Sequence, residues 1–182
     1  FVMTKTMRFL KIIFSVVLGL VSLMTALPTL AEWHSREEAI MGTLARVELW
    51  HDDATTARAA MSAVMDEMRR IDASMSPYKP DSELSRINRE AAQKPVMVSQ
   101  EMYDLIARSI EFSKLSGGAF DITFSSVGYL YDYREHVKPT DAQIAKALPG
   151  INYRHLQLDP KGRTIHFVRP GVRIDLGGIA KG

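Results

Sequence analysis

Polar and apolar residues alternate in the stretch after residue 40, and this alternation predicts a β-strand. Every second residue from Ala45 to Leu49 is apolar, and the residues between them are charged. A period of two is typical of a strand with one buried face. We therefore expect a half-buried strand close to the beginning of the folded part of the chain.

From Ala54 to Asp72 the apolar residues recur at the three- and four-residue spacing of a helix. Asp52 and Asp53 precede this stretch and can cap its first turn. The apolar positions are Ala57, Met61, Val64, Met65, Met68 and Ile71. Methionines can also form an adhesive or metal-binding stripe, but a single helical face favours packing into the core.

Two more helices are predicted by their capping residues. Asp81 or Ser82 can begin a short helix that carries two apolar residues, and residues 95–98 then form a short extended segment. Ser99 can cap a longer helix over residues 100–115, which the glycines at 117–118 end. The expected apolar face of the longer helix consists of Tyr103, Ile106, Ala107 and Ile110, broadened by Met102, Leu105 and Phe112.

The last third of the chain mixes both kinds of element. Residues 119–133 begin as an extended segment, and a short helix is expected from Thr140 to Gly150. Residues 156–167 form a hairpin around the turn Asp-Pro-Lys-Gly, and residues 172–176 form a final strand. The pattern as a whole predicts an α+β fold, with a mixed or antiparallel sheet and packed helices.

The first 31 residues have the order of a secretory signal peptide. Three basic residues precede an apolar run from Ile12 to Ala26, and small residues occupy the positions before a cleavage site after Ala31. An uncleaved membrane anchor is the alternative, although the run is short for spanning a bilayer. We expect a domain over residues 32–182 and a soluble periplasmic protein.

Charge and cysteine content narrow the function classes. The formal net charge of +2 depends on the three basic residues of the leader, and residues 32–182 carry a formal charge of −1. Nucleic acid is therefore not an expected partner. The chain has no cysteine, so disulfides, thiol catalysis and a lipidation cysteine after the leader are excluded. Its five histidines are scattered, and no serine lies in a G-x-S-x-G motif.

Three stretches combine glycine with polar groups where elements are expected to meet. These are "MGT" at 41–43, "SGGAFDIT" at 116–123 and "DLGGIAKG" at 175–182. Glycine permits close approach of the backbone to a ligand, aspartates can accept hydrogen bonds or bind a cation, and lysine can bind phosphate. Each stretch taken alone is better explained as a structural turn or a helix cap.

In this order, and with "SPYKPDSELSRIN" at 76–88, the stretches resemble the ApbE-type flavin transferases, also called FAD:protein FMN transferases. The resemblance covers residues 40–182 and implies an ApbE-like, T-fold-like domain of which this chain is the N-terminal part. It further implies an exported, magnesium-dependent enzyme that splits the pyrophosphate of FAD. FMN then passes as a phosphoester to a threonine of a partner protein, and AMP leaves.

The resemblance also assigns roles to single residues. Met41 matches a methionine beside the flavin, and Tyr78 matches an aromatic residue that stacks on its ring. The segment Ala119, Phe120 and Asp121 matches residues that contact FAD, as do Asp175 and Lys181. The backbone carbonyl of Gly178, or alternatively of Ala180, matches a magnesium ligand.

The implied partners are flavin-carrying subunits of membrane redox complexes of the Nqr or Rnf type, or exported flavoproteins. Family members continue beyond "DLGGIAKG" with a further half that completes the magnesium site, so we expect this chain to be a piece of a longer enzyme and inactive alone. An FAD pyrophosphatase, a non-catalytic flavin-binding module and a role in thiamine synthesis are the alternatives. The acceptor protein and the oligomeric state do not follow from the sequence.

Overall fold

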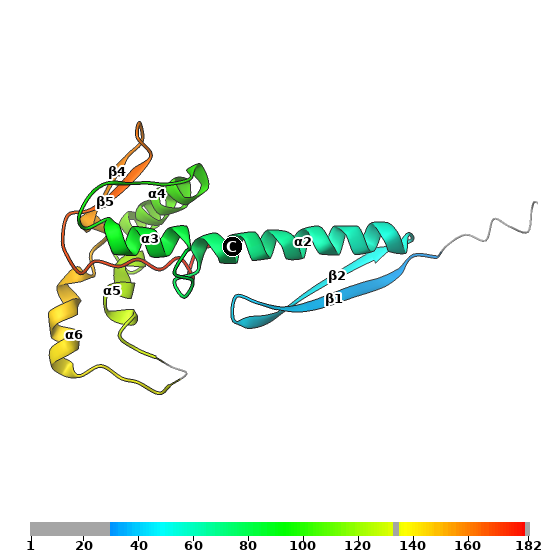
Figure 1. The fold of residues 1–182 in the computed structure, drawn as a ribbon, viewed down its shortest axis with the longest axis horizontal. Helices are drawn as coiled ribbons and strands as arrows, with labels where there is room; N and C mark the ends of the chain where they lie inside the picture. Colours follow the sequence, from blue (N-terminus) through cyan, green and yellow to red (C-terminus); the bar gives the residue numbers. More distant parts are fainter. Residues whose placement is uncertain (1–29, 133–134, 181–182) are drawn as a thin grey trace, which may run out of the picture. The chain divides into compact units, whose positions relative to one another are not determined.

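The computed structural model describes residues 30–132 and 135–180 of the 182-residue chain. These residues form two compact units (Figure 1). The first unit extends to Ala39 and includes Leu44–Met65, and the second comprises Ile40–Thr43 and the residues from Asp66 onward. Most of the predicted leader, and Lys181, lie outside the described residues.

A two-stranded hairpin dominates the first unit. Strand β1, Glu32–Ile40, pairs with β2, Thr43–His51, and β2 confirms the strand predicted from alternation (Figure 1). Strand β1 was not predicted, because its inward positions are largely polar. One of them, Arg36, pairs with Glu38 and donates a hydrogen bond from Nη1 to Ser62 Oγ at 2.6 Å.

Helix α2, Ala54–Met75, extends from the first unit into the second and confirms the predicted helix, with three further residues at its end. Asp53 caps it, since its Oδ1 accepts from Thr56 N at 2.6 Å. Hydrogen bonds from the Thr56 side chain and then from its backbone N lower the pKa of the Asp53 carboxyl. Ala57, Met61 and Met65 are buried as expected, but Val64 is 43% exposed, so its placement in the apolar face was wrong.

The second unit contains a three-stranded antiparallel sheet in the order β3-β5-β4. Strand β3 is Val96–Met97, β4 is Leu156–Asp159 and β5 is Thr164–Phe167. The register places Leu156 opposite Phe167, and Val96 opposite Ile165. The predicted hairpin and the predicted extended segment are both confirmed.

Helices α3, Glu83–Glu90, and α4, Gln100–Leu115, begin where their capping residues predicted. Ser82 Oγ accepts from Ser85 N, and Ser99 Oγ accepts from Met102 N. The buried residues of α4 are Met102, Ile106, Ser109 and Ser113, so the face predicted to include Ile110 is shifted. The two serines can be buried because each donates its hydroxyl to the carbonyl four residues earlier.

Arg70 connects α2 to α4 within the second unit. Its Nη1 and Nη2 donate to the two carboxylate oxygens of Glu101 at 2.7 and 2.8 Å. Its Nε and Nη2 donate to Glu67 in the same way. The hydrogen bonds from Arg70 to Glu101 lower the pKa of the Glu101 carboxyl. Their contribution to stability is therefore present at a pH above 4.5, the usual pKa of this group, and is lost as the pH falls through the lowered pKa.

The extended segment with which residues 119–133 were predicted to begin forms no strand in the described structure. After Asp121 the chain forms a 3-10 turn, η1, Ile122–Phe124, and the short helix α5, Ser125–Gly128. The cause is local, because Asp121 Oδ1 accepts from both the backbone N and Oγ1 of Thr123. Helix α6, Asp141–Ala147, follows with the capping box of Thr140 and Gln143, and the turns η2, Leu148–Gly150, and η3, Tyr153–His155, lead to β4.

The final strand predicted over residues 172–176 is also absent from the described structure, although the burial alternates as in a strand. Val172, Ile174 and Leu176 are buried, but their segment pairs with no strand. Its backbone instead bonds to side chains and a turn. Ile174 N donates to Asn88 Oδ1 at 2.8 Å, and Asn88 Nδ2 donates to Ile174 O at 2.9 Å.

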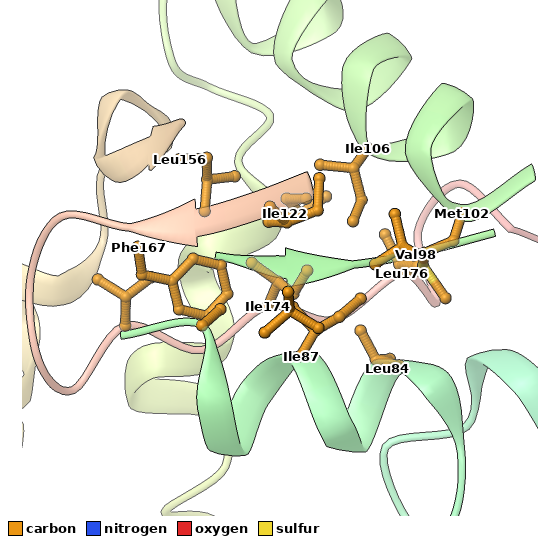
Figure 2. Close-up of a cluster of buried hydrophobic side chains, with 14 of the residues drawn as sticks. Leu84, Ile87, Val98, Met102, Ile106, Ile122, Leu156, Phe167, Ile174 and Leu176 are labelled. Atoms are coloured by element: carbon orange, nitrogen blue, oxygen red, sulfur yellow. The ribbon is translucent and has the colours of Figure 1, made fainter. Parts of the chain in front are cut away.

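One hydrophobic core holds the second unit together. Figure 2 shows Leu84 and Ile87 of α3 on one side of this core and Ile106 of α4 on the other, with Ile174 and Phe167 between them. All five side chains are at most 1% exposed.

The helices and strands together give a fold of the α+β class, with packed helices and antiparallel sheets. No helix in the described residues is long and apolar enough to cross a membrane.

Candidate functional site

The first predicted site residue, Met41, lies in the turn between β1 and β2. Met41 and Gly42 are the two connecting residues, and both have positive φ, 56° and 74°. Two-residue hairpins of type I′ require positive φ at both positions, which glycine adopts freely and methionine does not. A strained residue of this kind in a turn is a candidate for function.

Tyr78 lies in the loop between α2 and α3. Its side chain is 88% exposed, and several hydrogen bonds hold the loop around it. Ser82 Oγ donates to Ser76 O at 2.6 Å, and Ser82 N donates to Lys79 O at 3.1 Å. Ser85 Oγ reaches Pro77 O at 3.4 Å. The loop therefore presents an exposed tyrosine on a fixed backbone.

Asp175 lies at the end of the segment that Asn88 holds. Its Oδ1 accepts from Gly177 N at 2.7 Å, and its own backbone N donates to Ile122 O. The chain then turns, since Ile179 N and Ala180 N both donate to Leu176 O. The carboxylate is thereby fixed at the beginning of a glycine-containing turn.

These three residues line one cavity of about 480 Å³ in the second unit. Ligand pockets commonly have volumes of about 300–1,000 Å³ and combine apolar walls with a few polar groups. The remaining lining residues are Gly42, Ile71, Asp72, Met75, Ser76, Pro77, Lys79, Leu176, Gly177 and Ala180. The predicted residues Met41, Tyr78 and Asp175 thus meet at a site with apolar walls and polar edges.

Two charged residues of this cavity were not predicted as site residues. Asp72 and Lys79 form an ion pair, with 2.5 Å between Asp72 Oδ2 and Lys79 Nζ. Asp72 was assigned only to the end of a helix, and Lys79 was treated as part of a loop. Their contact depends on where α2 ends, and the sequence placed that end three residues too early.

The predicted segment 119–121 does not line the cavity but adjoins its last turn. A Cβ atom built on Gly178 would lie 3.6 Å from Phe120 Cε2, so Phe120 lies against that glycine. Ala119 is exposed. The Asp121 carboxylate accepts three internal hydrogen bonds, two from Thr123 and one from Tyr153 N at 2.8 Å. Within the described structure Asp121 therefore holds η1 to η3.

The predicted metal ligand Gly178 is exposed in the turn after Leu176. The described residues contain no group of three His, Cys, Asp or Glu side chains that could hold a metal ion. Near Gly178 the turn offers the Asp175 carboxylate and backbone carbonyls. Magnesium accepts oxygen donors of this kind, but it needs about six of them. The described residues alone do not complete a magnesium site.

Comparison with known families gives one match over most of the chain. The model of the ApbE family matches residues 41–182. Among curated proteins, the FAD:protein FMN transferase of Treponema pallidum is 30% identical over 158 residues, which are 82% of this chain and 43% of that protein. The protein of the same name from Haemophilus influenzae is 32% identical over 151 residues, covering 78% of this chain and 44% of that protein.

Solved structures agree with this match. The ApbE protein of Thermotoga maritima superimposes with a TM-score of 0.73 at 29% identity, over 83% of this chain and 49% of that one. The flavin transferase ApbE of Vibrio cholerae gives a TM-score of 0.70 at 26% identity, over 83% and 50%. The chain therefore spans less than half the length of these two curated relatives and about half of these solved structures.

Proposed function

The chain belongs to the ApbE family, and from this we propose that it forms the flavin-binding part of an FAD:protein FMN transferase. The observation that carries the proposal is the cavity at which Met41, Tyr78 and Asp175 meet. The residues aligned with the family were chosen from three separate stretches of sequence. Their meeting at one cavity supports a shared ligand.

The cavity walls suit a flat aromatic ring. Met41, Ile71 and Met75 contribute apolar surface, and the exposed residue Tyr78 lines the same cavity. Stacking between two aromatic rings contributes about 0.5–1.5 kcal/mol beyond the burial of their area. We propose that the isoalloxazine ring of FAD lies against Tyr78.

The proposed reaction is the transfer of FMN to a threonine of an acceptor protein. The threonine oxygen forms a bond to the phosphorus of the FMN half while the bond from that phosphorus to the bridging oxygen breaks. AMP leaves with the electron pair, and the hydroxyl proton is released. Because the nucleophile belongs to the acceptor, the chain itself needs no catalytic serine or cysteine. The proposed acceptors are subunits of Nqr- or Rnf-type redox complexes, or exported flavoproteins in the periplasm.

The turn after Leu176 is proposed to face the pyrophosphate. Asp175 would hydrogen-bond FAD, the Gly178 carbonyl would supply one magnesium ligand, and Lys181 would bind phosphate. A bound Mg²⁺ would offset the charge that builds on the phosphate oxygens, which would themselves supply further ligands. Phe120 lies against Gly178, so we propose that residues 119–121 hold this turn in place.

The experiment combines the full-length gene product with FAD, Mg²⁺ and an acceptor protein that carries the target threonine. Covalent flavin on the acceptor, seen as fluorescence in a denaturing gel, together with AMP release, is the expected result. AMP release without a labelled acceptor would support an FAD pyrophosphatase instead. If neither product forms, the transferase proposal is wrong and a flavin-binding module remains.

Variants of Tyr78 test the placement of the flavin, with FAD binding to the full-length protein measured by fluorescence titration. Tyr78→Ala is expected to weaken FAD binding about threefold or more, because the stacking partner is lost. Tyr78→Phe keeps the ring and should bind FAD almost as the wild type does. Equal binding by all three proteins would place the flavin elsewhere.

A further inference from the structure

The ion pair of Asp72 and Lys79 lies at the cavity, on either side of Tyr78 along the chain. The distance from Lys79 Nζ to Asp72 Oδ2 is 2.5 Å, and both residues line the cavity. The Asp72 side chain is only 16% exposed, whereas that of Lys79 is 49% exposed. A mostly buried carboxylate and a more accessible ammonium therefore border the same space.

Both groups retain unused hydrogen-bonding capacity. An ammonium has three N–H donors and a carboxylate has about four acceptor positions. Within residues 30–132 and 135–180, neither side chain has a hydrogen bond or ion pair other than the one between them. The pair thus presents donors and acceptors side by side at the edge of the cavity.

Stability of the loop does not explain the pair. The backbone of residues 76–82 is already held by the hydroxyl of Ser82 and by the backbone bond from Ser82 N to Lys79 O. Exposed ion pairs contribute about 0–1 kcal/mol, and burying a carboxylate has a cost of its own. A ligand that uses the open donors and acceptors would recover that cost.

The flavin ring offers the matching pattern. One edge of isoalloxazine resembles uracil, with an imide N–H between two carbonyl groups. We propose that Asp72 accepts a hydrogen bond from this N–H while Lys79 donates to a neighbouring carbonyl, so that the pair selects the ring by its pyrimidine edge. The proposal rests on the proposed function, because it takes the ligand to be a flavin stacked on Tyr78.

The main alternative is that Lys79 binds the pyrophosphate of FAD. The two can be separated with ligands that share only one half of FAD. Riboflavin carries the ring without phosphate, ADP carries a pyrophosphate without the ring, and 3-methylriboflavin blocks the imide N–H. Dissociation constants are measured for all four compounds, FAD included, with the full-length protein, using flavin fluorescence and calorimetry.

The wild type is expected to bind riboflavin about tenfold more tightly than 3-methylriboflavin, because hydrogen bonds to charged groups are among the stronger ones. Asp72→Ala should remove this preference, and Asp72→Asn, which keeps an acceptor, should retain much of it. Lys79→Met should weaken the binding of riboflavin and of FAD by similar factors and leave the binding of ADP unchanged. If Asp72→Ala does not fold, the constants of Lys79→Met for riboflavin, FAD and ADP carry the test.

Glu90 and Lys94 provide matched controls. They form an ion pair with 3.2 Å between Lys94 Nζ and Glu90 Oε2, and neither residue lines the cavity. Glu90→Gln and Lys94→Met should leave all four constants unchanged. The inference is overturned if Asp72→Ala keeps the wild-type preference, or if Lys79→Met weakens FAD and ADP but not riboflavin. If the wild type binds neither riboflavin nor FAD, the proposed function itself is wrong.

Discussion

Met41 adopts a backbone conformation that is unfavourable for its side chain, and it does so at the cavity. A residue with a Cβ atom loses about 1–2 kcal/mol in the left-handed region, which asparagine tolerates better. Met41→Asn should therefore raise the free energy of unfolding of the FAD-free protein by about 1 kcal/mol. It should also weaken FAD binding, because the methionine side chain lines the cavity. Chemical denaturation and fluorescence titration measure the two effects.

Arg163 is the matched control for this substitution. It has a φ of 47°, is exposed, and lies in the turn between β4 and β5 rather than at the cavity. Arg163→Asn should stabilise the protein to a similar degree with FAD binding unchanged. Unchanged FAD affinity in Met41→Asn would exclude Met41 from the binding surface.

Asp121 illustrates a residue whose role the sequence left between two readings. The resemblance assigned it to FAD, and the alternative was a structural turn. Its carboxylate accepts from the backbone N and hydroxyl of Thr123 and from Tyr153 N. Asp121→Asn would oppose one of these donors with an amide N–H, so we expect the FAD-free protein to lose about 1–3 kcal/mol. If Asp121→Asn has the melting temperature of the wild type, the structural role is wrong and direct contact with FAD is the main role of Asp121.

At the scale of elements, residues 172–176 show what periodicity can and cannot predict. The alternation of Val172, Ile174 and Leu176 predicted which side chains are buried. It did not predict the pairing partner, because that partner is the side-chain amide of Asn88, 86 positions away, rather than a strand. Such an amide supplies the donor and acceptor that a neighbouring strand would supply. A pattern of apolar residues does not predict a hydrogen-bond partner of this kind.

This amide is the contact that we expect to be most sensitive to substitution. Asn88→Asp keeps the acceptor for Ile174 N but faces Ile174 O with a carboxylate oxygen in place of a donor. Ile174 is fully buried and its carbonyl would lose this donor, so a loss of about 1–3 kcal/mol is expected. FAD affinity should fall as well, since Asp175 follows Ile174. Denaturation curves and titrations measure both.

Gln93→Glu supplies the same amide-to-carboxylate change at an exposed position that follows α3. It should change the free energy of unfolding by no more than about 0.5 kcal/mol, as is usual for substitutions at the surface. If Asn88→Asp is no more destabilised than Gln93→Glu, the side-chain pairing does not hold the segment.

Over the whole molecule, the sequence predicted the helices best because their signals are local. Ser82, Ser99 and Thr140 each cap the helix that was assigned to them. Strand β1 was missed because its inward positions are largely polar: Arg36 pairs with Glu38 of the same strand and also donates to Ser62 of α2. The meeting of Met41, Tyr78 and Asp175 could not be derived from periodicity, and it followed only from the resemblance of their motifs to a family.

The last prediction concerns a polypeptide restricted to residues 32–182. The described lining of the cavity lies within this range, so we expect it to bind FAD. It spans less than half of the curated relatives named above, and its described residues do not complete a magnesium site. FMN transfer needs the charge on the pyrophosphate to be neutralised in the transition state. We therefore expect FAD binding without a labelled acceptor and without AMP. Labelling at a rate close to that of a protein with the full length of its relatives would show that residues 32–182 contain the complete catalytic machinery.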